Sequence, residues 1–211
     1  MKYYSQVGQD KYLNEKVFKG KTNGFFVDIG AHDGVTFSNS LFFEETLGWN
    51  GLCIEPNPTV FTKLEKAREC ILENCCIADK EGEVEFLCGV GRTEMLSGIK
   101  ENYDPRHLNR MQREVQVYGG SINNIKVKSM PLHVLCEKHN IDHIDFCSID
   151  VEGSELNVLS GIDFGKVKVD YFCIENNFNE PLFRKYLEPK GYEIFGKVDS
   201  DDVFKLKSVQ P

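Results

Sequence analysis

Acidic residues stand at the ends of three short apolar segments of the sequence. Asp28 follows the run "FFV", Glu55 ends "GLCIE", and Asp150 ends "IDFCSID". Such apolar runs are typical of strands buried on both faces of a sheet. Ligands of parallel sheets bind outside the carboxyl ends of the strands, so the three carboxyl groups are candidates for one site. One acid alone would be weak evidence, but three favour a cleft.

The spacing between Gly30 and Glu55 favours a ligand that contains adenosine. Glu55 lies 25 residues after Gly30, about one strand–helix unit on, where an acid can bond both ribose hydroxyls. Gly30 and Gly34 have no Cβ atom, so the backbone there can approach a ligand closely. A nicotinamide enzyme would use the same acid, but "GAHDG" lacks the paired first glycines that cradle a pyrophosphate. The turn therefore suits S-adenosylmethionine better.

The composition limits the partners and the compartment. The formal net charge of −8 disfavours nucleic acid as the main partner. None of the eight cysteines stands in a CxxC pair, and several lie inside apolar runs, where Cys acts as a small buried hydrophobe. We therefore expect free thiols and a reducing, cytoplasmic location. No stretch approaches the roughly 18 apolar residues of a membrane span, and no signal-peptide segment is expected at the N-terminus.

Short strands alternate with helices along the chain. Strands are expected at 25–30, 51–55, 75–79, 82–90, 144–150 and 169–175, and a hairpin at 192–207. Helices are expected at 35–49, 57–69, 131–140, 154–162 and 180–188. This alternation predicts an α/β fold, in which helices cover both faces of a mostly parallel sheet and the hairpin adds an antiparallel edge. The length predicts a single domain that spans residues 1–211.

Residues 91–124 interrupt this alternation, and we expect this insertion to bind the acceptor. Long insertions in compact α/β domains are more often functional than accidental. His107 is the only histidine of the insertion and is a candidate base. Arg106 and Arg110 flank it and could hold an acidic or phosphate-bearing acceptor. A solvated helix face is the alternative interpretation.

Three longer motifs together resemble the FkbM family of S-adenosylmethionine-dependent methyltransferases. They are "VDIGAHDGVTFSNSLFF", "CIEPNP" and "IDFCSIDVEGSELNVLSGI", in this order, and "YSQVGQDKYL" precedes the first strand. The resemblance covers roughly residues 4–196 and is weakest in the insertion. It implies a Rossmann-like class I methyltransferase fold with a seven-stranded sheet. It also implies methyl transfer to a hydroxyl oxygen, often on a sugar of a glycan or a natural product.

The resemblance implies that one group of residues binds the methionine part of the cofactor. These residues belong to the glycine-rich turn and the segment that follows it: Asp28, Gly30, His32, Gly34 and Ser38. Ser38 would meet the carboxylate at a helix N-terminus. A capping role is the alternative for Ser38.

A second group would bind the rest of the cofactor. Glu55 would hold the ribose diol, and Asp79 would lie near the adenine amino group, although a turn role is its alternative. Asp150 would face the sulfonium or the acceptor. Gln6 and Gln9 could close the site from the N-terminal segment.

Methyl transfer to a sugar hydroxyl needs assistance, because this hydroxyl is a poor nucleophile at neutral pH. A general base can remove its proton, or a metal ion can lower its pKa. We expect Asp150 and Glu175 to be catalytic, with His107 as a further candidate base. Asp150, Glu175 and Asn176 could instead hold Mg²⁺ or Mn²⁺ through hard oxygen ligands. The sequence leaves both routes open.

Other functions are compatible with the same fold. The acceptor could be a protein, a nucleic acid or a small molecule other than a sugar, although the acidic charge disfavours nucleic acid. The chain could also be a non-catalytic module that binds the cofactor. Asp150 and Glu175 speak against that interpretation, since an inactive protein need not keep them. The sequence indicates neither which sugar hydroxyl is methylated nor an oligomeric state.

Overall fold

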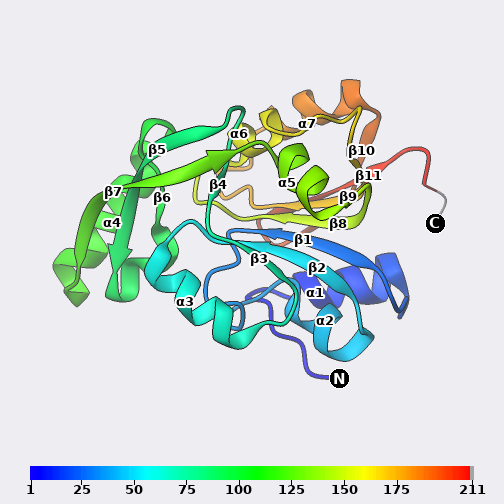
Figure 1. The fold of residues 1–211 in the computed structure, drawn as a ribbon, viewed down its shortest axis with the longest axis horizontal. Coiled ribbons are helices and arrows are strands. Elements are labelled where there is room, and N and C mark those ends of the chain that lie inside the picture. Colours follow the sequence, from blue (N-terminus) through cyan, green and yellow to red (C-terminus); the bar gives the residue numbers. More distant parts are fainter. Residues whose placement is uncertain (210–211) are drawn as a thin grey trace.

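A seven-stranded sheet lies at the centre of the fold (Figure 1). The computed structural model describes residues 1–209 of the chain, apart from the side chain of Asn102. The strand order is β10-β11-β9-β8-β1-β2-β3. The strands are β1 (Phe25–Ile29), β2 (Asn50–Ile54), β3 (Ile71–Glu73), β8 (His143–Ile149), β9 (Lys168–Ile174), β10 (Tyr192–Val198) and β11 (Asp201–Leu206). Five of them are parallel, and β11 pairs antiparallel with both β9 and β10. The predicted seven-stranded, mostly parallel sheet with a C-terminal hairpin is confirmed.

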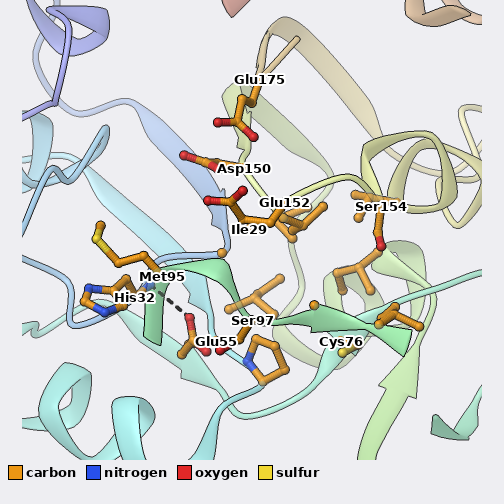
Figure 2. A pocket seen from close by; sticks show the side chains of 18 of the residues that line it. Ile29, His32, Glu55, Cys76, Met95, Ser97, Asp150, Glu152, Ser154 and Glu175 are labelled. Carbon is orange, nitrogen blue, oxygen red and sulfur yellow. Dashed lines mark hydrogen bonds between the residues drawn. The ribbon is translucent and has the colours of Figure 1, made fainter. Parts of the chain in front are cut away.

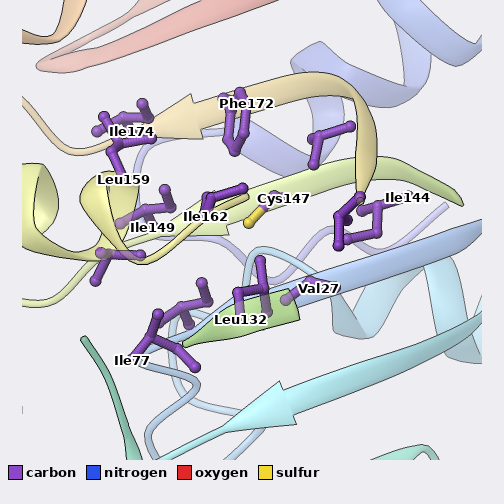
Figure 3. Close-up of a cluster of buried hydrophobic side chains, with 14 of the residues drawn as sticks. Val27, Ile77, Leu132, Ile144, Cys147, Ile149, Leu159, Ile162, Phe172 and Ile174 are labelled. Atoms are coloured by element: carbon purple, nitrogen blue, oxygen red, sulfur yellow. The ribbon is translucent and has the colours of Figure 1, made fainter. Parts of the chain in front are cut away.

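Helices cover both faces of this sheet because the side chains of each central strand alternate between two apolar cores. Val27 and Leu52 belong to a core shared with α5 (Leu132–His139), α6 (Glu155–Ser160) and α7 (Leu182–Leu187). Figure 3 shows part of this core, including Val27, Leu132 and Leu159. Phe26 and Phe146 point into the opposite core. That core is shared with the π-helical segment Leu13–Phe18 that follows α1 (Gln9–Tyr12), and with α2 (Leu41–Leu47) and α3 (Pro58–Ala67).

A second, four-stranded sheet was not expected from the sequence. Its order is β4-β7-β5-β6, and its strands are β4 (Cys76–Ile77), β5 (Gly82–Val90), β6 (Gly98–Ile99) and β7 (Ser121–Met130). Figure 1 shows β5, β6 and β7 together with α4 (Pro105–Tyr118) beside one end of the main sheet. The insertion forms a 3₁₀ turn over Gly91–Leu96, then β6, a second 3₁₀ turn over Lys100–Asn102, α4 and the start of β7.

Two predicted elements differ from the structure. The strand expected at 75–79 exists as the shorter β4, but it pairs with β7 in the second sheet, whereas β3 pairs with β2 in the main sheet. The helix expected at 35–49 begins only at Leu41. The side chain of Asp33 accepts hydrogen bonds from the N–H groups of Val35 and Thr36 at 2.9 and 2.7 Å, so the chain turns there instead of forming helix.

Both edges of the main sheet are short or irregular. The edge strand β3 has three residues. At the other edge, the pairing of β10 with β11 shifts between Ile194 and Gly196, where one residue bulges out. A Cβ atom at Gly196 would lie 2.1 Å from the Tyr12 hydroxyl, so the bulge packs against the N-terminal segment.

The described residues hold all eight cysteines as free thiols, seven of them buried. This agrees with the expectation of structural cysteines. No helix within residues 1–209 has the length and apolar character needed to cross a membrane.

Candidate functional site

A cavity of about 240 Å³ opens at the carboxyl ends of the central strands. The ends of β1, β2, β8 and β9 line it, together with the N-terminal segment and the start of the insertion. Figure 2 shows two groups of polar side chains in it: Glu55 with His32 on one side, and Asp150, Glu152 and Glu175 on another. The cavity therefore has the position at which parallel sheets bind ligands.

Glu55 follows β2, and the backbone holds its carboxylate in place. Its Oε2 atom accepts a hydrogen bond from the His32 N–H at 3.0 Å, and its Oε1 atom accepts one from the Asn57 N–H at 2.7 Å. Each oxygen keeps a further lone pair for a ligand. Burial raises the pKa of Glu55 to about 7, although the two backbone N–H groups act in the opposite direction. Glu55 is therefore a fixed hydrogen-bond acceptor in the cavity wall.

The turn after β1 passes very close to the end of β8. Gly30 has φ of +88°, and a Cβ atom there would lie 1.8 Å from the carbonyl oxygen of Asp150. Only glycine fits such an approach. The glycine thus lets two strand ends converge, and Gly30 and Asp150 both line the cavity.

His32 presents a polar ring to the cavity. Its two ring nitrogens are buried and have no hydrogen-bond partner among the described residues. Burial is the main cause that lowers the pKa of His32 below its usual value. A neutral imidazole can donate one hydrogen bond to a ligand and accept another.

Three carboxyl groups converge beside the end of β8. One carboxyl oxygen of Asp150, one of Glu152 and one of Glu175 lie within 4.8 Å of one another. Burial raises the pKa of Asp150 well above its usual value, and the charge of Glu175 adds to this effect. Burial also raises the pKa of Glu175 to about 8, with Glu152 as the next cause. We call these three residues the acidic trio.

His107 supports the trio from α4. Its Nδ1 atom lies 2.8 Å from Oε2 of Glu152, and the guanidinium of Arg110 lies 4.0 Å from the same oxygen. His107 is buried and does not line this cavity, but it lines the second hollow described below. It therefore contacts Glu152 from the side of that hollow.

A second hollow of about 360 Å³ lies on the other side of the trio. It runs between the N-terminal end of α4, the start of α6 and the segment after β9. Ser154, Glu175 and Asn177 line both the cavity and this hollow. The trio therefore lies where two ligands could meet.

A family model of the "Methyltransferase FkbM domain" matches residues 28–197. The chain belongs to the FkbM methyltransferase family. The family supports an enzyme of the methyltransferase class and implies S-adenosylmethionine as its methyl donor.

Solved structures agree on the fold. The FkbM methyltransferase of Methylobacillus flagellatus KT is 16% identical with a TM-score of 0.55, and the match covers 96% of this chain and 48% of that one. The chain thus spans about half the length of this relative. A human methyltransferase 10 domain-containing protein is 15% identical over 87% of this chain and 70% of that one, with a TM-score of 0.41. No curated protein matches the sequence.

In the present chain, several residues that were predicted to bind the cofactor do not line the cavity. Asp28 accepts a hydrogen bond from the Ser40 hydroxyl at 2.5 Å. Ser38 accepts one from the Leu41 N–H at 3.1 Å, so it stabilises the start of α2. A Cβ atom at Gly34 would lie 2.6 Å from side-chain carbons of Arg68. These positions favour structural roles and do not support direct contact with the cofactor.

Two further predictions of polar contacts are corrected by geometry. Asp79 is exposed beside Lys80 and lies outside the cavity lining. Asn176 does not join the acids as a metal ligand, because its amide oxygen accepts a hydrogen bond from the Glu180 N–H at 2.8 Å and its amide nitrogen donates to Asp202 at 2.6 Å. Glu152 takes the place beside Asp150 and Glu175 that the sequence analysis had given to Asn176.

The N-terminal segment lines part of the cavity. The sequence analysis expected this of Gln6 and Gln9. Both residues line it, and the Gln9 amide donates to Asp201 at 2.9 Å. Asp201 itself was missed. It starts the antiparallel strand β11, and only the strand order places it beside β9 and the cavity.

Arg68 is the other residue that sequence reasoning missed. Its side chain is 0% exposed and lies 2.6 Å from the Glu44 carboxylate. It also donates to the Gly34 carbonyl at 3.1 Å and to the Ser40 hydroxyl at 3.1 Å. Arg68 follows α3 in a charged stretch, "KLEKARE", which gives no signal that this one cation is buried.

Proposed function

We propose that this chain is an S-adenosylmethionine-dependent O-methyltransferase that methylates a hydroxyl group of a sugar. The observation that carries the proposal is the position of Glu55. Its fixed carboxylate lies in a cavity that also contains the Gly30 turn and reaches the acidic trio. An enzyme of this kind needs a site for adenosine and, next to it, groups that act on a hydroxyl.

The cavity lining fits the proposed methyl donor. Glu55 has one free lone pair on each oxygen, which suits the two hydroxyls of a ribose. The second sheet adds Ile77, Phe86 and Ile99, an apolar wall suited to a flat purine. His32 and Gln9 supply polar contacts for an amino-acid tail, and the acidic side chains near Asp150 favour a cationic ligand.

The donor supplies a methyl group already activated by the sulfonium. The remaining tasks are to align the acceptor oxygen and to remove its proton. Asp150 and Glu175 are placed for the second task, since Glu175 lines both the cavity and the second hollow. The trio also has the oxygen ligands that a divalent cation prefers, and such an ion would lower the pKa of the hydroxyl instead.

The second hollow is the proposed acceptor site. Phe178 lines it and is 38% exposed, and Asn157 and Asn177 add amide groups. Exposed aromatic rings and amides suit the alternating apolar and hydroxyl surfaces of a sugar. Residues 101 and 103–107 of the insertion line this hollow, which supports the proposed role of the insertion in acceptor binding.

The charges around this hollow favour a neutral acceptor over a phosphorylated one. Arg106 is engaged by Asp104 at 2.6 Å and by Glu180 at 2.8 Å. Arg110 lies 3.1 Å from Glu114. Neither guanidinium is free for an anion, so the alternative of an acidic or phosphate-bearing acceptor is disfavoured.

Calorimetric titration with S-adenosylhomocysteine tests the cofactor site. The wild type should bind, the Glu55→Gln variant should bind at least about 10-fold more weakly because it loses a charge-assisted pair of hydrogen bonds, and Glu55→Ala should not bind detectably. Glu65→Ala, an exposed acid on α3, is the matched control and should bind as the wild type does. Absence of binding to the folded wild type would contradict the proposal.

A panel of acceptors tests the reaction itself. The enzyme, S-adenosylmethionine and each acceptor are incubated, and methylated products are identified by mass spectrometry. We expect transfer to neutral glycosides and little transfer to their phosphate esters. Transfer to peptides or nucleic acids alone would show that the acceptor class is wrong while leaving the methyltransferase assignment in place.

A further inference from the structure

No lysine among residues 1–209 pairs with the acidic trio. Its carboxyl oxygens approach within 4.8 Å, a distance at which three ionised carboxylates would repel one another strongly. The cation nearest to Glu152 is Arg110, 4.0 Å away, but its side chain is 54% exposed and is engaged by Glu114. The described residues thus supply no close, buried cation that could compensate three ionised carboxylates.

A second acidic cluster in the same protein provides a comparison. His143, Asp145 and Asp170 also bring three potential ligand atoms within 4.8 Å. There, Asp145 pairs with Lys21 at 2.5 Å and Asp170 with Lys168 at 3.0 Å. Ion pairs account for that cluster, whereas no lysine pairs with the acidic trio within residues 1–209.

His107 gives a second, independent indication of a ligand beside the trio. It is 4% exposed, and its Nδ1 atom has no hydrogen bond within residues 1–209 although it lies 2.8 Å from Oε2 of Glu152. That oxygen is also buried without a hydrogen bond among the described residues. Buried polar atoms normally have partners. Carboxylates that bind a metal ion are usually held in place by a further polar group, and His107 lies close enough to Glu152 to be that group.

We propose that Asp150, Glu152 and Glu175 bind one divalent cation, with His107 as the residue that positions Glu152. Three carboxylates and water are hard oxygen ligands, which favour Mg²⁺ or Mn²⁺ over softer metals. Binding of the ion does not depend on the proposed reaction. Its catalytic role does rest on the proposed function: Glu175 lines both hollows, so the ion would lie beside the acceptor hydroxyl and lower its pKa.

Electron paramagnetic resonance measures this binding directly, because the signal of free Mn²⁺ is lost when the ion binds. The apo-protein is titrated with Mn²⁺ in the absence of cofactor, and Mg²⁺ is then added as a competitor. We expect one site in the wild type and an affinity at least about 10-fold lower in Glu152→Gln and in Asp150→Asn. Two variants are used so that a folding failure of one, checked by circular dichroism, leaves the other informative.

Two controls separate the site from the general negative charge of the protein. Glu65→Gln removes an exposed acid, and Asp170→Asn removes a member of the lysine-paired cluster; both should bind Mn²⁺ as the wild type does. For His107, we expect His107→Ala to weaken Mn²⁺ binding and His107→Gln to restore part of it. A purely structural role would change the stability of both variants without this difference in affinity.

The outcomes distinguish the cation from the function. If the wild type binds S-adenosylhomocysteine but no Mn²⁺ at millimolar concentration, the cation site is refuted and the methyltransferase proposal stands. Equal Mn²⁺ affinity in the wild type and both trio variants would also refute the site. If Mn²⁺ binds and S-adenosylhomocysteine does not, the cation site stands and the proposed function fails.

Discussion

Glu55 is buried, and it is also proposed to bind the cofactor as an ionised carboxylate. These two properties rarely occur together. Backbone N–H groups of His32 and Asn57 stabilise the ionised form, whereas burial favours the neutral form. The balance places its pKa at about 7. The ionisation of Glu55 should therefore change the affinity for the cofactor near neutral pH.

We expect the affinity for S-adenosylhomocysteine to rise as the pH increases from about 6 to about 8. Glu55 must be ionised to accept hydrogen bonds from both ribose hydroxyls, and it loses its proton as the pH passes about 7. Calorimetric titrations at several pH values measure this. The pH dependence should be much smaller in Glu55→Gln, and an equal dependence in that variant would assign the effect to another group.

Glu55 should also affect the stability of the protein in a defined direction. Its pKa is raised from 4.5 to about 7 on folding, so the folded state binds the proton more tightly. The free energy of unfolding thus includes a contribution that is fully present below about pH 4.5 and is lost as the pH rises through about 7. Urea denaturation of the wild type and Glu55→Gln at pH 5 and pH 8 should show this difference.

Gly30→Ala should destabilise the protein by more than about 2 kcal/mol. The added Cβ atom would lie 1.8 Å from the Asp150 carbonyl oxygen, so a strand end must move. Gly20→Ala is the matched control, because Gly20 has a similar φ of +78° with nothing within 4 Å of the added atom. It should cost only the strain of the left-handed conformation, about 1 kcal/mol. Equal losses in urea denaturation would contradict the proposed clash.

At the scale of elements, the strands were easier to predict than the loops. The buried strands β1, β2, β8 and β9 are continuous apolar runs, and their bounds differ from the predicted ones by one residue at each end at most. The segment 35–40 was predicted as helix because its composition allows it. The Asp33 carboxylate accepts a hydrogen bond from the Val35 N–H, and the buried Arg68 donates to the Gly34 carbonyl; these contacts prevent the helix, and no local pattern contains that information.

The same distinction applies to the candidate site. Glu55, Gly30, Asp150 and Glu175 were found because each follows a recognisable strand, and all four line the cavity. Asp79 and Asn176 were expected by the same rule but point elsewhere, since the rule places a residue without orienting its side chain. Asp201 could not be found, because its place depends on how an antiparallel hairpin joins the sheet.

Arg68 holds the loop 34–40 to α2 and α3, so its loss should be costly. We expect Arg68→Leu to destabilise the protein by about 3–5 kcal/mol, because Glu44 and Asp28 would lose their compensating charge. Arg68→Lys should recover only part of this, since lysine lacks the fork of donors. Chemical denaturation measures both, with the exposed Arg113→Leu as control. A loss below 1 kcal/mol would argue against this role of Arg68.

The segment after β9 should determine acceptor affinity without affecting the cofactor. We expect Phe178→Ala to raise KM for the acceptor about 10-fold, because an aromatic contact of about 1 kcal/mol or more is lost. KM for S-adenosylmethionine should stay unchanged. Phe37→Ala, which removes another exposed phenylalanine, should change neither constant. A change in the KM for S-adenosylmethionine alone would place Phe178 in the cofactor site instead of the acceptor site.

At the scale of the whole molecule, the cavity gathers segments from the entire chain. Its lining includes Gln6 near one end and Asp201 near the other, with the second sheet between them. The chain nevertheless spans about half of its FkbM relative from Methylobacillus flagellatus. The proposed acceptor specificity therefore refers to the site in this chain and not to a whole protein of that length.

The irregular borders of the main sheet bear on how this protein behaves at high concentration. An unpaired strand of regular geometry recruits strands of other molecules. The edge strand β3 has only three residues, so it offers few unpaired backbone groups to a strand of another molecule. At the opposite edge, the bulge next to Gly196 interrupts the regular geometry of β10. The molecule can therefore keep a wide, mostly parallel sheet and still resist polymerising through its own backbone.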